Sequence, residues 1–139
     1  MPVEIEAIRT VEVPTRLVHG TGAITRLGDV MRELGVTRPL LVTDPGVAAA
    51  GLAERALGRL DDAVVFDRVR PNPDIALVDE GAALYAESGC DGLVGLGGGS
   101  SMDTAKSIGV VARHGGSIAQ YEWGHDPIVE RIPPLATIP

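Results

Sequence analysis

The sequence is poor in several residue types, and each shortage removes a class of protein. Cys90 is the only cysteine, so a framework of internal disulfides is excluded. Aromatic residues make up only 3% of the chain, so aliphatic side chains must build the core. Twelve basic residues stand against 19 acidic ones, giving a formal net charge of −7. That balance argues against a nucleic-acid partner, because such proteins need a basic surface.

A secretion signal and long apolar runs are also missing. Glu4 and Glu6 interrupt the amino-terminal stretch, where a signal peptide needs consecutive apolar residues. No segment reaches the length of a membrane span. We therefore expect a cytoplasmic protein without membrane contact. A length of 139 residues suits one domain covering 1–139.

Apolar segments without polar alternation, each followed by residues at helical spacing, make up most of the chain. Extended segments are predicted at 39–43, 63–66, 92–96 and 132–138, and helices at 23–34, 47–60 with a break near Gly51, 75–88, 101–113 and 117–121. This alternation predicts an α/β fold, a Rossmann-like parallel sheet with helices on both faces. Residues 11–17 alternate loosely around Pro14, which predicts an edge strand.

Three consecutive glycines, Gly97, Gly98 and Gly99, follow an apolar strand, and Ser100 opens the next helix. Glycine lets a ligand approach the backbone closely, and a helix N-terminus offers unpaired N–H groups and a positive dipole end. The segment therefore predicts a phosphate-binding turn. The alternative is a tight turn with Ser100 as the helix N-cap. Neither G-x-G-x-x-G nor the Walker pattern fits, because Ser100 replaces the third glycine and no Lys-Ser or Lys-Thr pair directly follows.

Charged residues flank this turn and a neighbouring strand end. Asp44 follows the strand at 39–43, at the edge where open α/β sheets bind nucleotides. Its carboxylate can accept hydrogen bonds from ribose and would repel a 2′-phosphate; the alternative is a turn aspartate. Asp103 lies near the start of the following helix, with Lys106 three residues on. The alternative to a ligand contact is stabilisation of the helix dipole for Asp103 and a local ion pair with Asp103 for Lys106.

Several motifs occur in an order that resembles the iron-containing alcohol dehydrogenase family. They are Gly20-Thr21-Gly22, Leu41-Val42-Thr43-Asp44, Val69-Arg70-Pro71-Asn72-Pro73, Cys90-Asp91-Gly92, the run from Gly97 to Lys106, and Pro134-Leu135-Ala136-Thr137-Ile138-Pro139. The resemblance implies an N-terminal α/β domain that binds NAD, with NADP as an alternative. It also implies hydride transfer between the cofactor and a small alcohol or aldehyde in the full enzyme.

The resemblance extends to individual residues. It implies that Gly97, Gly98, Gly99 and Ser100 cradle the pyrophosphate, that Asp103 belongs to the same motif, and that Asn72 lies near the adenine. It also implies a homodimer formed through an N-terminal strand, within residues 3–18.

Family members continue into a helical domain that holds a divalent metal, iron or zinc. The chain is therefore expected to supply the cofactor-binding half, inactive by itself, without catalytic residues or a metal site. His19, His114 and His125 lack the spacing of metal ligands. Two alternatives are a non-catalytic truncated or split protein that binds a nucleotide or dimerises, and a relative of glycerol dehydrogenase.

Overall fold

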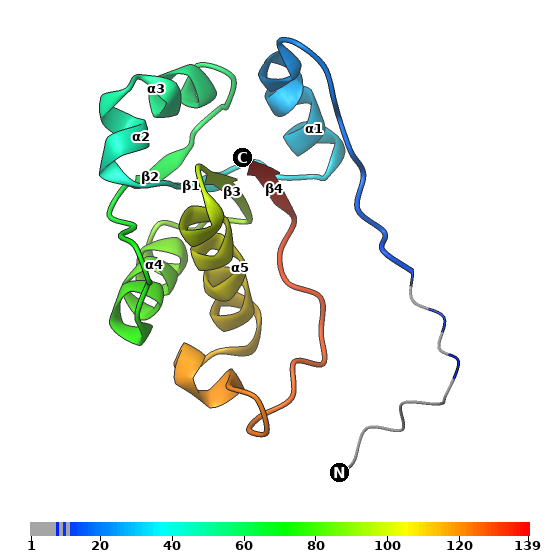
Figure 1. The fold of residues 1–139 in the computed structure, drawn as a ribbon, viewed down its shortest axis with the longest axis vertical. Helices are drawn as coiled ribbons and strands as arrows, with labels where there is room; N and C mark the ends of the chain where they lie inside the picture. The colour runs from blue at the N-terminus through cyan, green and yellow to red at the C-terminus, as the bar shows by residue number, and fades with distance from the viewer. Residues whose placement is uncertain (1–7, 9, 11) are drawn as a thin grey trace.

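Four parallel strands form one sheet in the part of the chain that the computed structural model describes, residues 8, 10 and 12–139. They are β1 (Pro39–Val42), β2 (Val64–Phe66), β3 (Gly92–Leu96) and β4 (Leu135–Ile138), in the spatial order β2-β1-β3-β4 (Figure 1). The chain runs from β1 outward to β2 and then crosses back to β3. The strand order therefore reverses between β1 and β3, where ligands bind in open parallel sheets.

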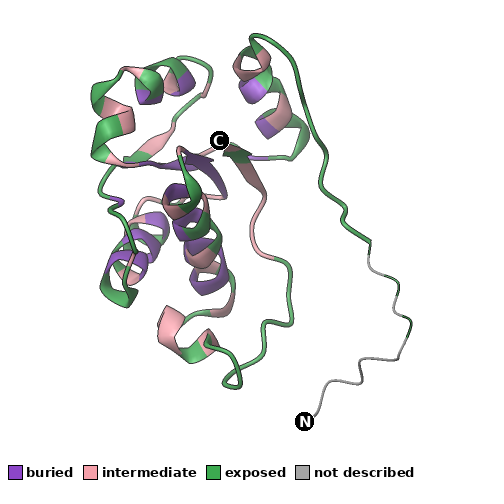
Figure 2. Ribbon diagram, viewed as in Figure 1, coloured by how far each residue is buried: buried purple, intermediate pink, exposed green. Residues whose placement is uncertain are grey.

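Helices cover both faces of the sheet, as predicted (Figure 2). On one face, α1 (Leu27–Glu33), α2 (Pro45–Ala49) and α3 (Leu52–Leu57) pack against Leu41 and Val94. On the other face, α4 (Ile75–Glu87) and α5 (Gly99–His114) pack against Leu40 and Leu93. Neighbouring strand residues point to opposite faces, so the two fully buried central strands, β1 and β3, are apolar at every position. The predicted α/β fold is confirmed.

The shorter elements also follow the sequence pattern. Gly51, with a φ of +79°, separates α2 from α3, which confirms the predicted break. Two short 3₁₀ helices, η1 (Ala23–Arg26) and η2 (Ile118–Tyr121), precede α1 and follow α5. Among the helices of the described residues, none has the length and apolar character needed to cross a membrane.

Asp91 joins the starts of the two central strands. Its carboxylate accepts hydrogen bonds from the Thr37 N–H at 2.9 Å, the Thr37 hydroxyl at 2.7 Å and the Arg38 N–H at 2.8 Å. Burial raises the pKa of Asp91, but these hydrogen bonds together lower it by more. The net effect leaves the pKa below its ordinary value. The charged carboxylate therefore fixes the register in which Pro39 pairs with Gly92.

Thr43 joins the opposite ends of the same strands. Its fully buried hydroxyl donates to the Leu96 carbonyl at 2.8 Å. The Val69 N–H donates to the Thr43 carbonyl at 3.2 Å, which brings in the segment that follows β2. The loops after β1, β2 and β3 therefore lie along one edge of the sheet.

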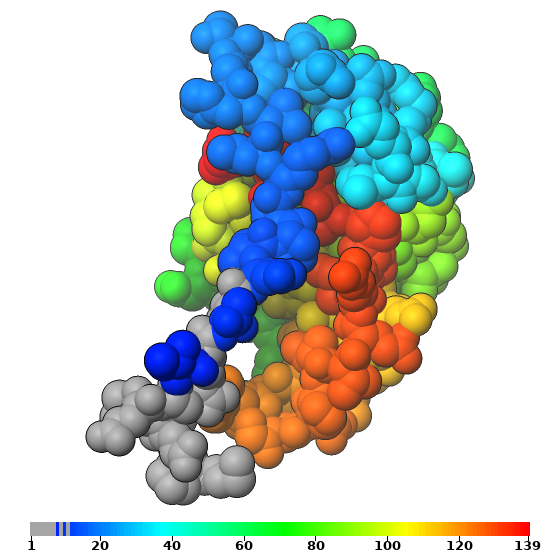
Figure 3. Space-filling view, turned by 90° about the vertical axis from the view of Figure 1, so that its right-hand side faces the viewer, coloured from blue at the N-terminus to red at the C-terminus, as the bar shows by residue number. Residues whose placement is uncertain are grey.

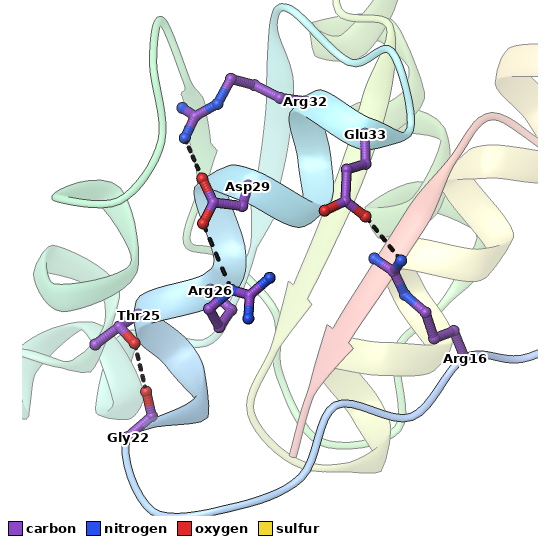
Figure 4. Close-up of polar contacts among 7 residues, drawn as sticks. All are labelled: Arg16, Gly22, Thr25, Arg26, Asp29, Arg32 and Glu33. Atoms are coloured by element: carbon purple, nitrogen blue, oxygen red, sulfur yellow. Dashed lines mark hydrogen bonds and ion pairs between the residues drawn. The ribbon is translucent and has the colours of Figure 1, made fainter.

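The amino-terminal segment departs from the prediction. Residues 12–19 contain no strand, so the predicted strand at 11–17 is wrong where the structure describes it. Val13 and Leu17 are 76% and 83% exposed, and Pro14 has no N–H to donate to a neighbouring strand. The Arg16 guanidinium donates to the Glu33 carboxylate at 2.7 Å, beside the Asp29 pairs with Arg26 and Arg32 (Figure 4).

Figure 3 shows this segment, in blue, lying across one side of the molecule. Residues 3–7, 9 and 11 of the predicted dimer segment 3–18 lie outside the described residues. The dimer therefore stays a prediction.

Candidate functional site

The glycine turn connects β3 to α5. Gly97 has a φ of +128°, and its N–H donates to the Ile138 carbonyl at 3.0 Å, at the end of β4. Gly98 is the N-cap of α5, with a φ of −73° and a ψ of −172°. The prediction that Ser100 caps this helix is wrong, because the extended Gly98 already allows the helix to begin at Gly99. Glycine is accepted at N-cap positions.

Three backbone N–H groups in this turn are available to a ligand. The N–H groups of Ser101 and Met102 both donate to the Gly98 carbonyl, each at 3.1 Å. Those of Gly98, Gly99 and Ser100 have no acceptor among the described residues. A Cβ built on Gly98 or Gly99 would meet nothing within 4 Å. These donors lie unengaged at the positive end of a 16-residue helix, with open space beside Gly98 and Gly99, an arrangement that suits an anion.

Asp44 lies directly beside this turn. It follows β1 and caps α2, since its Oδ1 accepts a hydrogen bond from the Val47 N–H at 2.9 Å. Its Oδ2 lies 3.2 Å from the position that a Cβ on Gly97 would occupy. Asp44 is therefore a helix N-cap rather than a turn aspartate, because Pro45 and Gly46 belong to α2, and its second carboxylate oxygen is left facing the glycine turn.

Asn72 lies in the exposed loop between β2 and α4. Its φ is +52°, in the left-handed region that asparagine tolerates better than most residues. At the end of the same loop, Asp74 accepts hydrogen bonds from the Leu77 N–H and the Arg70 guanidinium, both at 2.9 Å. The Arg70 hydrogen bond lowers the pKa of Asp74. Because this loop follows β2, which neighbours β1 in the sheet, Asn72 lies at the same edge of the sheet as Asp44 and the glycine turn.

Asp103 lies farther from the turn than predicted. Because α5 begins at Gly99, Asp103 is beyond the first helical turn. Its side chain is 72% exposed and lies 3.5 Å from the Lys106 ammonium. The local ion pair is confirmed, and a cofactor role for Asp103 stays a prediction.

Two buried polar residues of this edge did not emerge from the sequence. Thr43 ends an apolar run, and Ser101 is the second serine after the glycines. Ser101 is 1% exposed, and its hydroxyl has no hydrogen-bond partner among the described residues. A polar residue within a segment that must be buried was the available signal, because such groups are normally hydrogen-bonded.

The other side chains that could act in catalysis or bind a metal lie in surroundings that do not favour either role. Burial raises the pKa of the Cys90 thiol, which weakens it as a nucleophile. The Nδ1 atom of His114 lies 3.0 Å from the Val110 carbonyl, and its Nε2 accepts from the Glu130 N–H at 3.2 Å. Within the described part of the chain, no three His, Cys, Asp or Glu side chains gather where they could hold a metal ion.

The fold is that of an α/β domain with a candidate anion-binding turn at the edge of its sheet. Comparison with known proteins gives the family: a model of iron-containing alcohol dehydrogenases matches residues 14–139. The chain belongs to this family, whose members are oxidoreductases.

Individual relatives agree with this family. The chain is 50% identical to choline dehydrogenase of Bacillus subtilis (strain 168), covering 97% of this chain and 35% of the relative. It is 45% identical to 4-hydroxybutyrate dehydrogenase of Cupriavidus necator, covering 85% and 32%. The structure of sulfoacetaldehyde reductase from Bifidobacterium kashiwanohense in complex with NAD+ matches with a TM-score of 0.80 and 28% identity, covering 86% and 32%. The chain thus spans about a third of the length of these relatives, and it matches their N-terminal portion.

Proposed function

We propose that this chain binds NAD at the carboxyl edge of its sheet and serves as the cofactor-binding part of an NAD-dependent alcohol dehydrogenase. The observation that carries the proposal is the set of unengaged N–H groups on Gly98, Gly99 and Ser100. They lie at a helix N-terminus, which favours a pyrophosphate. The NAD+ complex of a relative with the same fold supports this choice of ligand.

Each residue of the edge has a distinct part in this proposal. The three N–H groups bind the pyrophosphate, and Gly97 makes the sharp turn that presents them. Oδ2 of Asp44 accepts a hydrogen bond from a ribose hydroxyl, as acidic residues do at this position of related folds. The same negative charge repels a 2′-phosphate, so the chain prefers NAD to NADP.

Asn72 and Asp103 take outer positions. Asn72, on the loop after the neighbouring strand β2, borders the adenine side of the ligand. Asp103 lies at the rim and reaches the pyrophosphate through a water molecule or a cation, since two anions need a mediator.

NAD, when bound, supplies hydride chemistry, and a small alcohol or aldehyde is the proposed partner in that exchange. The residues of this chain bind and orient the dinucleotide. The proposal assigns the divalent metal to a helical domain outside these 139 residues. It also includes a cytoplasmic location and a homodimer formed through residues 3–18.

Calorimetric titration with NADH and with ADP tests the proposal. ADP carries the pyrophosphate, ribose and adenine that the described edge should bind. We expect saturable binding of both, one ligand per chain, with NADPH weaker than NADH. An absence of saturable binding for both NADH and ADP would contradict the proposed function.

A further inference from the structure

The buried hydroxyl of Ser101 is an unusual feature of the glycine turn. The residue is 1% exposed, yet its Oγ has no hydrogen-bond partner among the described residues. Thr104, one turn later, is also buried, but its hydroxyl donates to the Ser100 carbonyl at 2.6 Å. A buried hydroxyl without a partner destabilises a folded protein. Its presence beside the proposed binding site therefore indicates a role in binding.

Gly97 brings this hydroxyl close to Asp44. The position that a Cβ on Gly97 would occupy lies 3.1 Å from Ser101 Oγ and 3.2 Å from Asp44 Oδ2. Because glycine has no Cβ, a narrow slot stays open between a hydroxyl donor and a carboxylate acceptor. A Cβ at residue 97 would crowd both groups, and each would have to shift by a few tenths of an ångström.

The Asp44 carboxylate is held at one oxygen only. Oδ1 accepts from the Val47 N–H at 2.9 Å, and Oδ2 has no hydrogen bond within the described part of the chain. An ionised carboxylate offers about four acceptor sites. Oδ2 can therefore accept from a protein hydroxyl and from a ribose hydroxyl at the same time.

We propose that Ser101 is a positioning residue that acts through Asp44. When the dinucleotide binds, the Ser101 hydroxyl donates a hydrogen bond to Asp44 Oδ2 across the slot in front of Gly97. Both carboxylate oxygens are then held, Oδ1 by the Val47 N–H and Oδ2 by Ser101. The remaining acceptor site of Oδ2 points at the ribose. This inference rests on the proposed function, because it requires that Asp44 accepts a hydrogen bond from the ribose.

The proposal predicts opposite effects on the free and the bound protein. In the free protein the Ser101 hydroxyl is a donor without an acceptor, so Ser101→Ala removes a destabilising group. In the complex the same variant removes a charge-assisted hydrogen bond, a class stronger than neutral ones. A residue with a purely structural role would lose stability on truncation and would not change ligand selectivity.

The test compares Ser101→Ala with Ser107→Ala, a half-buried serine on the same helix outside the turn. We expect Ser101→Ala to melt at the wild-type temperature or above, to bind NADH about tenfold more weakly, and to discriminate less between NADH and NADPH. Ser107→Ala should bind both ligands like the wild type. In an Asp44→Ser background, Ser101→Ala should cause no further loss of affinity.

Three results would overturn the inference while leaving the proposed function in place. One is a lower melting temperature for Ser101→Ala, which would show that the hydroxyl is already satisfied in the free protein. Another is wild-type NADH affinity in Ser101→Ala; the proposed function would then stand without the Ser101 contact. A third is an equal loss of affinity with and without Asp44, which would place the hydroxyl on a different partner. If the wild type bound neither NADH nor ADP, the proposed function and the inference would fall together.

Discussion

At the scale of single residues, Gly98 is a position where a side chain should change the site without changing the fold. Its φ of −73° is open to any residue, and a Cβ there meets nothing within 4 Å. We predict that Gly98→Val fills the space in front of the three N–H groups and weakens NADH binding by at least about tenfold, or about 1.4 kcal/mol. Calorimetric titration measures the loss.

Gly97→Ala supplies the contrast for this prediction. Its φ of +128° strains any L-residue, and its Cβ would lie 3.1 Å from Ser101 Oγ. That variant should lose stability by about 1 kcal/mol or more, whereas Gly98→Val is unstrained and should lose only what valine costs relative to glycine at an N-cap. NADH affinity unchanged in Gly98→Val would show that the anion does not sit at the turn.

Asp44 should set the preference between NAD and NADP. We predict that Asp44→Ser reduces the ratio of NADH to NADPH affinity by about tenfold or more, because a charge that repels the 2′-phosphate at short range is removed. Serine is a good N-cap, so the contact to Val47 N–H at 2.9 Å can be replaced and α2 retained. Competitive titration with both cofactors gives the ratio.

Asp74→Ser is the matched control, because Asp74 caps α4 in the same way, with Leu77 N–H at 2.9 Å. Its charge is already paired with Arg70, and its substitution should leave the ratio close to the wild-type value. Equal ratios in the wild type and Asp44→Ser would remove Asp44 from the ribose site.

At the scale of elements, Asp91 should hold β1 and β3 in register. Asp91→Asn weakens the hydrogen bonds to Thr37 and Arg38, and we predict a loss of about 1–3 kcal/mol in the free energy of unfolding at pH 7. The pKa of Asp91 is lowered in the folded protein. Its stabilisation is therefore complete above the unfolded pKa of about 3.9, and it is lost as the pH falls through the lower folded value.

Urea denaturation at neutral pH and in acid checks this dependence. The difference between the wild type and Asp91→Asn should shrink as the pH falls below the folded pKa of Asp91. Asp61→Asn is the control, since Asp61 is 86% exposed and its carboxylate lies 3.3 Å from the Arg32 guanidinium; exposed pairs of this kind contribute about 0–1 kcal/mol. If the free energies of unfolding of the wild type and Asp91→Asn differed by the same amount across the pH range, the role of the charged carboxylate would be contradicted.

The sequence predicted those elements whose cause is local. Apolar runs and the break at Gly51 are read from neighbouring residues, and the structure confirms both. The strand at 11–17 failed because a strand needs a pairing partner, which local alternation does not supply. The start of α5 was misplaced because Ser100 is a good cap in isolation, whereas the turn geometry gives the position to Gly98.

The candidate site was predictable in part for the same reason. The glycine turn and Asp44 follow from strand ends in a parallel sheet, and the structure brings them together. The role of Thr43 depends on contact with a residue distant in the chain, the 2.8 Å bond to the Leu96 carbonyl, and the burial of Ser101 depends on how the turn packs. Such contacts leave no periodic signal in the sequence.

At the scale of the whole molecule, the amino-terminal segment should control association. Val13 and Leu17 are 76% and 83% exposed on an extended segment, and exposed apolar surface of this kind favours association. We predict that the chain sediments as a homodimer and that Val13→Ser combined with Leu17→Ser gives a monomer at the same concentration.

Ile128→Ser combined with Val129→Ser is the matched control, because those side chains are also exposed, at 53% and 74%, on a different segment. This control should remain a dimer. A monomeric wild type at tens of micromolar, or a dimer that survives the Val13 and Leu17 substitutions, would contradict pairing through this segment.

The central claim concerns the N–H groups of Gly98, Gly99 and Ser100, and nuclear magnetic resonance observes them directly. In ¹H–¹⁵N spectra of the chain titrated with NAD+, we predict that these three amide resonances move most and saturate together, because a phosphate becomes their acceptor. The Gly97 amide, already bonded to the Ile138 carbonyl at 3.0 Å, should move less. Saturating shifts elsewhere with these three resonances unmoved, or no shifts at all, would contradict the account.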